Sequence, residues 1–557
     1  MRYLIKKLLK KFKIRDYAAT NWKQIISENK EEFELIKKKA QGKKIVITTS
    51  AGGLLFCSHF ESLLAFALTY YGAKVEILLC DKVLPACMMA TSKIIEEKKF
   101  QKEGVKSICS SCLDSGKFAF DGLDLKLHYF SNFIKKKEIL DCRNKIKNIS
   151  YSDLSKFKED DINIGEHSLA GALRYYAVGS LDNEQYKENT LRKFTEAGYL
   201  TKKVIENFLK ENSDTDIIIS NHAIYVPQGI INDVGKKFKI RTISYTTNYI
   251  KNSFVFSHKD SYHHTLKDEP STEWEGIVFN KIKENKLINY LNSRKYGTYD
   301  WGYYFKKPAF KIDKILKNKG IDIKKPIILL TPNIIWDANL IYKDNIFSNQ
   351  LEWIFKTFEF FKNKNLQLII RSHPGEVNAD RVSKQQVKNE ILKRYKKIPS
   401  NIFLIGPEEN ISTYSIADYS NVILIYASKI GVELSPVGKN VIVAGESYVK
   451  NKGITYDPKS QKEYFDLLEK LPFKDKLSES RLLRAKKYAY HFWFRRTIVP
   501  LSVEERLNQW PLFGINKNIF YNLKENKDFP LKEICNSIIQ NKPFIYDELD
   551  NNKIKKI

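Results

Sequence analysis

Short apolar runs rich in β-branched residues recur along the chain, and helical periods separate them. Residues 43–81 predict a strand, an apolar helix and a second strand, and residues 215–229 and 240–246 predict two further strands. Such runs are typical of parallel sheets that helices cover on both faces. The first half therefore predicts one doubly wound α/β domain, with helical insertions across about 85–215.

A second series of the same kind begins after a Lys- and Pro-rich stretch, residues 305–325, which predicts a linker. Its predicted strands are 326–333, 366–374, 402–406, 421–428 and 440–445. Two such series predict two Rossmann-like domains that face each other across a cleft. Because ligands bind at the carboxyl ends of doubly wound sheets, the cleft is the expected site.

The chain is expected to divide into four regions. These are a basic amphipathic helical segment, a Rossmann-like domain with a cysteine-bearing insertion, a second Rossmann-like domain and a helical tail, at 1–40, 41–310, 320–500 and 501–557.

The first seventeen residues place Leu, Ile and Phe at helical spacing with lysines between them, the pattern of an interfacial membrane anchor. A helix packed on the main body, with its lysines in water, is the alternative. No apolar run approaches the roughly 18 residues of a membrane span, and lysines interrupt the start before a signal sequence forms. We therefore expect a cytoplasmic protein, peripheral on the inner face of the cytoplasmic membrane.

Basic residues exceed acidic ones, with 94 Lys and Arg against 65 Asp and Glu and a net charge of +29. Such a charge attracts polyanions or an anionic membrane surface. The lysines are spread along the whole chain, so compositional bias is an equal explanation. The 43% hydrophobic content excludes an intrinsically disordered chain.

Polar side chains follow two strands of the second series, where each strand ends. Arg371, His373 and Glu376 follow one apolar strand, and Asn333 and Asp337 follow another. Arg371 and His373 can both donate to phosphate oxygens. Because the carboxyl ends of parallel strands meet at one edge, these side chains are expected to hold a ligand together.

The stretch from Ser428 to Gly445 predicts a short helix that carries Glu433 among apolar residues. Ser428 and Lys429 stand at its start, where free N–H groups and the helix dipole favour an anion. A nucleotide diphosphate there brings its ribose near Glu433, whose carboxylate accepts hydroxyls. Tyr414 is expected to form a wall for the base or the sugar. The alternative is a Glu433 that points to solvent.

The order "NIIWDA", "IIRSHPGE" and "GPEENISTYSIADYSNVILIYASKIGVELSPVGKNVIVAGESYVKNKGITYDP" resembles the C-terminal domain of bacterial capsule and surface-polysaccharide glycosyltransferases of the GT-B type. The resemblance includes relatives of Kdo-transferring capsule synthesis proteins and covers about 325–500. It implies that the domain at 320–500 holds the sugar nucleotide and the domain at 41–310 the acceptor. It also implies that His373 and Ser428 contact phosphate and that Glu433 contacts the ribose or the hydroxyls next to the base. Lys429 replaces the small residue of the family pattern, which implies a partly ionic phosphate contact.

Two residues of the first half are candidates for a general base near the acceptor hydroxyl. His222 follows an apolar strand, and Glu166 stands at a predicted helix start. A structural strand-end histidine is the alternative for His222. Because the sequence lacks a phosphate-binding loop, an H-E-x-x-H pair and a suitably placed D-x-D, we expect no cofactor for catalysis and no metal at the diphosphate.

Four cysteines form two pairs in a chain that is expected to be reduced. Cys80 and Cys87 are followed by Cys109 and Cys112, and four such thiolates commonly bind a structural zinc. An iron–sulfur cluster would use the same ligands. Free buried cysteines and a redox pair are the alternatives.

These observations predict a glycosyltransferase that builds a capsule or lipopolysaccharide-type glycan. The expected donor is a CMP-, UDP- or GDP-sugar, the expected acceptor is a lipid-linked glycan at the inner membrane, and no nucleic acid is expected. A sugar-nucleotide epimerase of the same fold and a basic nucleic-acid or membrane-binding protein are the alternatives. The polar strand ends argue against the last, since a binder driven by charge does not need them.

Overall fold

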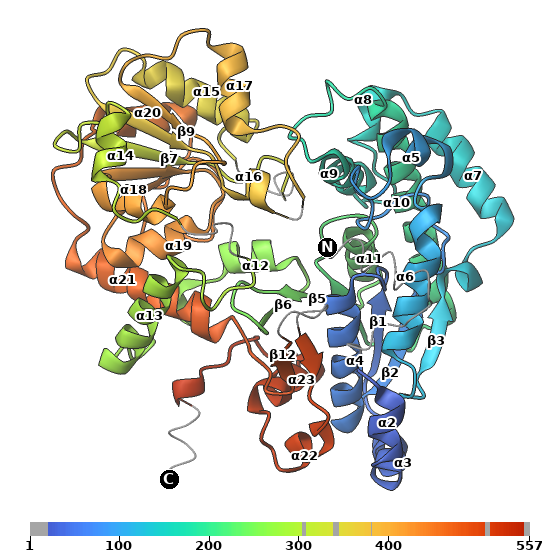
Figure 1. Ribbon diagram of the computed structural model, residues 1–557. Coiled ribbons are helices and arrows are strands. Elements are labelled where there is room, and N and C mark those ends of the chain that lie inside the picture. Colours follow the sequence, from blue (N-terminus) through green and yellow to red (C-terminus); the bar gives the residue numbers. More distant parts are fainter. Residues whose placement is uncertain (1–19, 303–307, 338–344, 380, 507–512, 551–557) are drawn as a thin grey trace.

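The computed structural model forms two lobes, and the chain passes between them more than once (Figure 1). It describes residues 20–302, 308–337, 345–379, 381–506 and 513–550. The expected membrane-anchoring segment, residues 1–17, lies outside the described residues, so membrane association stays a prediction. Within the described ranges, every helix is too short or too polar to cross a membrane.

The N-terminal domain is a doubly wound sheet, as the sequence predicts. Its strand order is β3-β2-β1-β4-β5-β6, in which all neighbouring pairs are parallel except β5 and β6. The strands are β1 (Lys44–Thr49), β2 (Lys74–Leu79), β3 (Lys126–Tyr129), β4 (Ile217–Asn221), β5 (Arg241–Thr247) and β6 (Phe254–His258). Alternate residues of β1 enter different cores, with Ile45 and Ile47 on one face and Val46 on the other.

Helices cover both faces of this sheet. They are α2 (Trp22–Ser27), α3 (Lys30–Lys39), α4 (Leu55–Tyr70), α5 (Glu97–Glu103), α6 (Lys106–Ala119), α7 (Lys136–Lys147), α8 (Tyr151–Leu154), α9 (Ile164–Tyr176), α10 (Lys187–Glu211) and α11 (Gln228–Lys237), with a 3-10 turn at Phe130–Phe133. The insertion expected to be helical also contains β3. This edge strand has only four residues and little apolar pattern, so its pairing with β2 decides its conformation.

The C-terminal domain repeats the same winding with five parallel strands in the order β11-β10-β7-β8-β9. They are β7 (Ile327–Thr331), β8 (Gln367–Arg371), β9 (Ile402–Ile405), β10 (Val422–Ile425) and β11 (Asn440–Val443). The connecting helices are α15 (Gln350–Phe361), α16 (Gly375–Asn378), α17 (Val387–Arg394), α18 (Thr413–Tyr419), α19 (Ile430–Leu434), α20 (Gln461–Glu469) and α21 (Glu479–Tyr490), with a 3-10 turn at Ser435–Val437. Each predicted strand of this series is present.

The segment between the two sheets belongs to the C-terminal core. It contains α12 (Tyr262–Asp268), a 3-10 turn (Ser271–Glu273), α13 (Lys281–Arg294) and α14 (Asp313–Asn318). Leu287 and Leu291 of α13 pack in one cluster with Ile327 and Ile423 of the second sheet. The boundary between the cores therefore falls earlier than the linker expected at 305–325.

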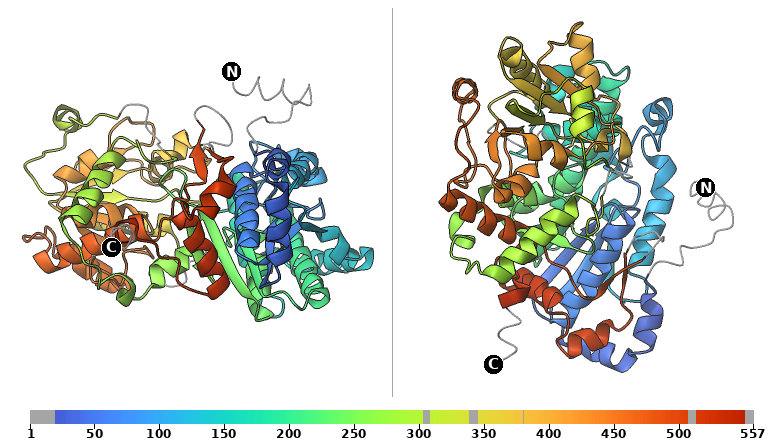
Figure 2. Two further views of the ribbon diagram at one scale, coloured as in Figure 1. Left: turned by 90° about the horizontal axis from the view of Figure 1, so that it is seen from below. Right: turned by 60° about the vertical axis from the view of Figure 1, so that its left-hand side comes forward.

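The C-terminal segment crosses back to the first domain. After a π-helical turn (His491–Arg495), Ile498 pairs with Phe254 of β6. The chain then forms β12 (Val503–Glu505), β13 (Phe513–Ile515), α22 (Ile519–Lys524) and α23 (Phe529–Gln540). In both views of Figure 2 this red segment lies against the blue helices, and its apolar side chains join the N-terminal core. The expected helical tail is thus a structural part of the first domain.

Phe520 provides a test of this packing. Its ring is buried between Phe33 and Phe66, so Phe520→Ala should lower the free energy of unfolding by about 3–5 kcal/mol. The neighbouring Tyr521 is 53% exposed, and Tyr521→Ala should cost less than about 1 kcal/mol. Urea unfolding measures both, and equal stabilities of the two variants would contradict the packing of the tail on the first domain.

Candidate active site

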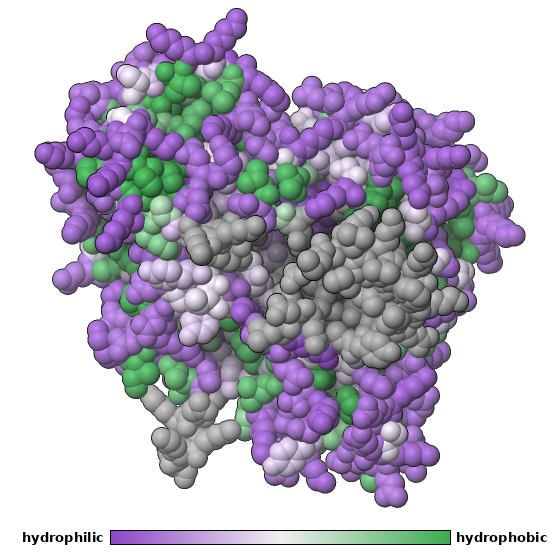
Figure 3. Space-filling model, viewed as in Figure 1, coloured by the Kyte–Doolittle hydropathy of each residue, from purple (hydrophilic) through white to green (hydrophobic). Residues whose placement is uncertain are grey.

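A cavity of about 460 Å³ lies where the carboxyl ends of the two sheets meet. From the first domain and the segment after it, Asn248, Tyr249, His263 and Arg294 line it. Eight of the nine predicted donor-binding residues line its other side: Asn333, Asp337, Arg371, His373, Tyr414, Ser428, Lys429 and Glu433. The visible described surface around the lobes is mostly hydrophilic (Figure 3). The convergence of the predicted residues makes the cavity between the sheets the candidate site.

Glu433 is the centre of a buried charged cluster in this cavity. Its carboxylate accepts hydrogen bonds from the Tyr414 hydroxyl at 2.6 Å and the Lys429 ammonium at 2.7 Å, and the Arg294 guanidinium lies 3.2 Å away. Burial favours a raised pKa, but Arg294 and Lys429 together hold the pKa of Glu433 below its ordinary value. Glu433 is therefore an ionised carboxylate that does not point to bulk solvent.

Arg294 is a site residue that the sequence did not reveal. It ends α13, pairs with Asp300 at 2.6 Å, and lies 4.7 Å above the ring of Trp493. It is 8% exposed, although a buried arginine is uncommon without partners. Its position as the last residue of a lysine-rich helix carries no signal, since only the fold brings it to Glu433.

Lys429, the residue that departs from the family pattern, has a defined place. Its ammonium lies one helical turn before Glu433 and 4.6 Å from the centre of the Tyr249 ring. Burial and the charge of Arg294 lower the pKa of Lys429. Because α19 has only five residues, its dipole is small, and the two cationic side chains supply most of the positive charge.

His373 is neutral and has a defined tautomer. The Gly375 N–H donates to its Nδ1 at 3.0 Å, so the single proton of the neutral ring is on Nε2. Burial, followed by the charges of Lys429 and Arg371, lowers its pKa to about 3. The ring thus presents an N–H donor, which suits a phosphate oxygen.

Arg371 and Glu376 form hydrogen bonds with the backbone of neighbouring segments. The Arg371 guanidinium donates to the carbonyls of Gly406, Glu409 and Ile411, which ties the loop after β9 to β8. Glu376 does not line the cavity, and burial raises its pKa to about 8, so the carboxyl group is protonated. Both residues therefore support the loops around the site.

Asn333 and Ser428 also shape these loops. Asn333 Oδ1 accepts from the Ala427 N–H at 3.2 Å and joins the ends of β7 and β10. Ser428 Oγ accepts from the Ile430 N–H at 3.3 Å at the start of α19.

The two candidate bases occupy different places. His222 does not line the cavity, but its ring lies 5.4 Å from that of Tyr225, whose hydroxyl donates to Asp337 of the cavity, and its backbone is in the left-handed region at φ 68°. Burial and Arg174 lower the pKa of His222 to about 4, so it is neutral at pH 7. Glu166 lines a separate cavity of about 490 Å³, together with His167 and other polar residues.

The four cysteines share one neighbourhood, in which each thiol affects the pKa of another. Burial raises the pKa of Cys80 to about 12, and Cys112 and Cys109 add to this effect. Burial and the neighbouring thiols also raise the pKa of Cys87. All are free thiols, and in the described part of the chain no three His, Cys, Asp or Glu side chains are placed to hold a metal ion. The zinc or iron–sulfur site stays a prediction, and no chemistry is assigned to it.

The buried His373 makes the stability of the fold depend on pH. The pKa of a histidine in the unfolded chain is about 6.5, so below that pH the unfolded state binds a proton that the folded state lacks. This residue then lowers the free energy of unfolding as pH falls, by up to about 1.4 kcal/mol per unit. In urea titrations, the free energy of unfolding of His373→Asn should therefore fall less steeply than that of the wild type between about pH 6.5 and about pH 4.5. The difference in slope should be up to about 1.4 kcal/mol per pH unit. Identical slopes for the two proteins would contradict the neutral buried ring.

Comparison with known proteins gives a family for the second half. Residues 278–489 match the model of a family described as "Capsule polysaccharide biosynthesis protein". A search of curated proteins finds no match.

Three solved structures show low similarity. The Thermosulfurimonas dismutans KpsC beta Kdo 2,4 transferase is 12% identical, covers 52% of this chain and 82% of its own, and has a TM-score of 0.34. The beta Kdo 2,7 transferase of the same organism is 14% identical, covers 58% of this chain and 89% of its own, and has a TM-score of 0.29. A Listeria monocytogenes protein described as a putative UDP-N-acetylglucosamine 2-epimerase is 10% identical, covers 91% of this chain and 99% of its own, and has a TM-score of 0.26.

The family match agrees with the structure of the second half. It begins just before α13 and includes Arg294, which the structure assigns to the C-terminal core. It also includes every predicted donor-binding residue, which confirms the resemblance expected from the strand-end motifs. Residues 278–489 are thus similar to the capsule polysaccharide biosynthesis protein family.

Proposed function

We propose that the chain is a glycosyltransferase that moves a sugar from a nucleotide-sugar donor to a growing surface glycan. The observation that carries the proposal is the cavity between the two sheets, which brings together eight side chains predicted from separate strand ends. Such a cavity at the carboxyl ends of doubly wound sheets is the usual place for a nucleotide. The family of residues 278–489 supports a role in polysaccharide synthesis.

The donor phosphate would lie against Lys429, Arg294 and the His373 Nε2–H group. Lys429 and Arg294 share the carboxylate Glu433, and Arg294 also pairs with Asp300, so an anionic phosphate would approach cations that are already desolvated and held in place. Oε1 of Glu433 meets both cations, whereas Oε2 accepts from the Tyr414 hydroxyl and can accept one further hydrogen bond, for example from a ribose hydroxyl. The same cations would stabilise the negative charge on the nucleotide as it leaves.

In the transfer step, an oxygen of the acceptor forms a bond to the anomeric carbon, and the bond from that carbon to the donor phosphate breaks. The acceptor hydroxyl proton moves to His222, and the electron pair of the broken bond leaves with the nucleotide. The neutral His222 ring can accept this proton, and an anionic donor nearby would raise its low pKa toward neutrality. Glu166 lines the other cavity, which makes His222 the preferred base.

The finer features of the function remain predictions. They are the lipid-linked acceptor, the location at the inner membrane, and the nucleotide of the donor. The absence of a metal requirement at the phosphate also belongs here, because Lys429 and Arg294 would take the role that a divalent ion has in other transferases.

Donor binding tests the first part of the proposal. At least one class among CMP-, UDP- and GDP-sugars should raise the melting temperature of the wild-type protein. Lys429→Met removes one charged partner of the phosphate and should weaken binding of that donor by about 10- to 100-fold in isothermal titration.

Lys295→Met is the matched control. Lys295 follows Arg294 directly but pairs with Asp418 outside the cavity, so this variant should bind the donor as wild type does. Stabilisation by none of the three nucleotide classes would refute the proposal. Conversion of the donor into an epimeric nucleotide sugar without any glycan acceptor would assign the site to an epimerase.

Catalysis tests the second part of the proposal. His222→Asn should lower kcat by about 100-fold or more, while the Kd of the donor changes less than about twofold. Glu166→Gln should keep wild-type kcat because that carboxylate lines the separate cavity. The reverse pattern, with a large loss only in Glu166→Gln, would make Glu166 the base. Transfer of radiolabelled sugar to a membrane-extracted acceptor provides the measurement.

A further inference from the structure

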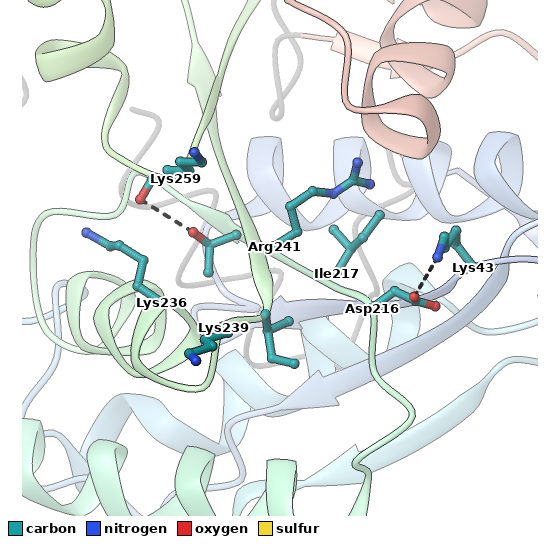
Figure 4. A pocket seen from close by; sticks show the side chains of 9 residues that line it. Lys43, Asp216, Ile217, Lys236, Lys239, Arg241 and Lys259 are labelled. Atoms are coloured by element: carbon teal, nitrogen blue, oxygen red, sulfur yellow. Dashed lines mark hydrogen bonds and ion pairs between the residues drawn. The ribbon is translucent and has the colours of Figure 1, made fainter.

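A second hollow lies at the opposite edge of the N-terminal sheet, where the strands begin. Its volume is about 490 Å³, and five cationic side chains line it: Lys43, Lys236, Lys239, Arg241 and Lys259. Figure 4 shows these side chains arranged around the hollow, with Asp216 at one end. The hollow shares no lining residue with the cavity that we assign to the donor.

The positive charge of this hollow is only partly balanced. Asp216, the single acidic residue among its lining residues, lies 2.8 Å from the Lys43 ammonium. Lys236 pairs with Asp233 at 3.0 Å. Lys239 and Lys259 are exposed, and neither forms an ion pair with any described residue. The hollow therefore keeps several cations that an anionic ligand can neutralise.

The backbone places these two lysines with unusual conformations. Lys239 follows α11 at φ 59°, and Lys259 follows β6 at φ 66°, both in the left-handed region that most side chains avoid. The Lys259 N–H donates to the Thr242 carbonyl at 2.8 Å, which holds it beside β5. Tertiary contacts thus fix both lysines at the rim of the hollow.

Further cations extend this charge along the edge of the sheet. Lys74 begins β2 and Arg241 begins β5, whereas Lys44 at the start of β1 is buried and pairs with Asp214 and Glu76. Lys126 begins β3 at the far side and is exposed, as is Lys74. Since neighbouring strands are about 4.8 Å apart, the edge presents positive charges over roughly 20 Å. This arrangement suits an extended ligand with repeated negative charges.

We propose that this basic edge binds an anionic glycan chain that carries carboxylates on successive sugars. The proposal rests on the proposed function, since a glycan is the expected product. A hollow admits a charged group that projects from a chain, whereas a bilayer presents its charges in a plane. None of the residues that line the hollow is aromatic, although single-stranded nucleic acids are usually bound by stacking on aromatic rings.

The test uses the full chain and a labelled oligogalacturonate of about ten sugars, which carries one carboxylate per sugar. Wild-type protein should bind it in fluorescence anisotropy, and binding should weaken as salt is raised. Lys239→Glu with Lys259→Glu should weaken binding by about tenfold or more, because two attractions become repulsions. The milder pair Lys239→Gln with Lys259→Gln should show a smaller loss in the same direction.

Lys474→Glu with Lys476→Glu is the matched control, since it changes the net charge equally on an exposed part of the second domain. It should alter binding less than about twofold. Lys429→Met, in the donor cavity, should leave glycan binding unchanged, so failure of donor binding and failure of this site are separate results.

Three outcomes would overturn the proposal. The first is that the oligogalacturonate does not bind. The second is that Lys239→Glu with Lys259→Glu and Lys474→Glu with Lys476→Glu lose equal affinity for it. The third is that single-stranded DNA or phosphatidylglycerol vesicles bind more tightly than the oligogalacturonate and that Lys239→Glu with Lys259→Glu weakens this binding. Equal affinity for a neutral dextran of the same length would show that charge is not the basis of recognition.

Discussion

The buried ion cluster around Glu433 is the interaction on which the site depends. Burying a carboxylate, an ammonium and a guanidinium costs free energy that their mutual attraction must offset. The three groups come from α13 and the two ends of α19, so the cluster holds the segment between the sheets against the second domain. Apolar residues of the same volume would pack there at lower cost, which is a reason to assign these charges to ligand binding.

Contacts between the two domains complete this arrangement. The Tyr225 hydroxyl donates to Asp337 at 3.0 Å, and the Lys384 N–H donates to the Ala177 carbonyl at 3.1 Å. The C-terminal segment adds the pairing of Ile498 with Phe254. Because the chain crosses between the lobes in both directions, a ligand between the sheets contacts groups whose separation the fold determines. The N-terminal sheet presents the cavity at the carboxyl ends of its strands and excess cations at the opposite edge, where its strands begin.

Much of the fold and part of the site follow from local patterns. Continuous apolar runs and the turn residues between them identify the strands of both sheets, since burial on both faces leaves few polar positions within a strand. The apolar strand β8 ends at Arg371, and His373 follows it. Polar residues at the end of an apolar strand indicate that this end faces a polar site. The short strand β3 and the course of the C-terminal segment have no such signal, and long-range packing decides both.

The sequence by itself determined the two doubly wound domains, their shared cleft and eight of the residues that line it. Only the tertiary structure decided how the charged groups pair: Arg371 donates to backbone carbonyls, whereas Arg294 reaches Glu433 from a distant helix. It also decided that Lys429 neutralises Glu433 and that lysines from separate strands gather at one hollow. The physical reason is that a pattern along the chain reports burial of each element, whereas charge pairing depends on distances between elements that are far apart in sequence.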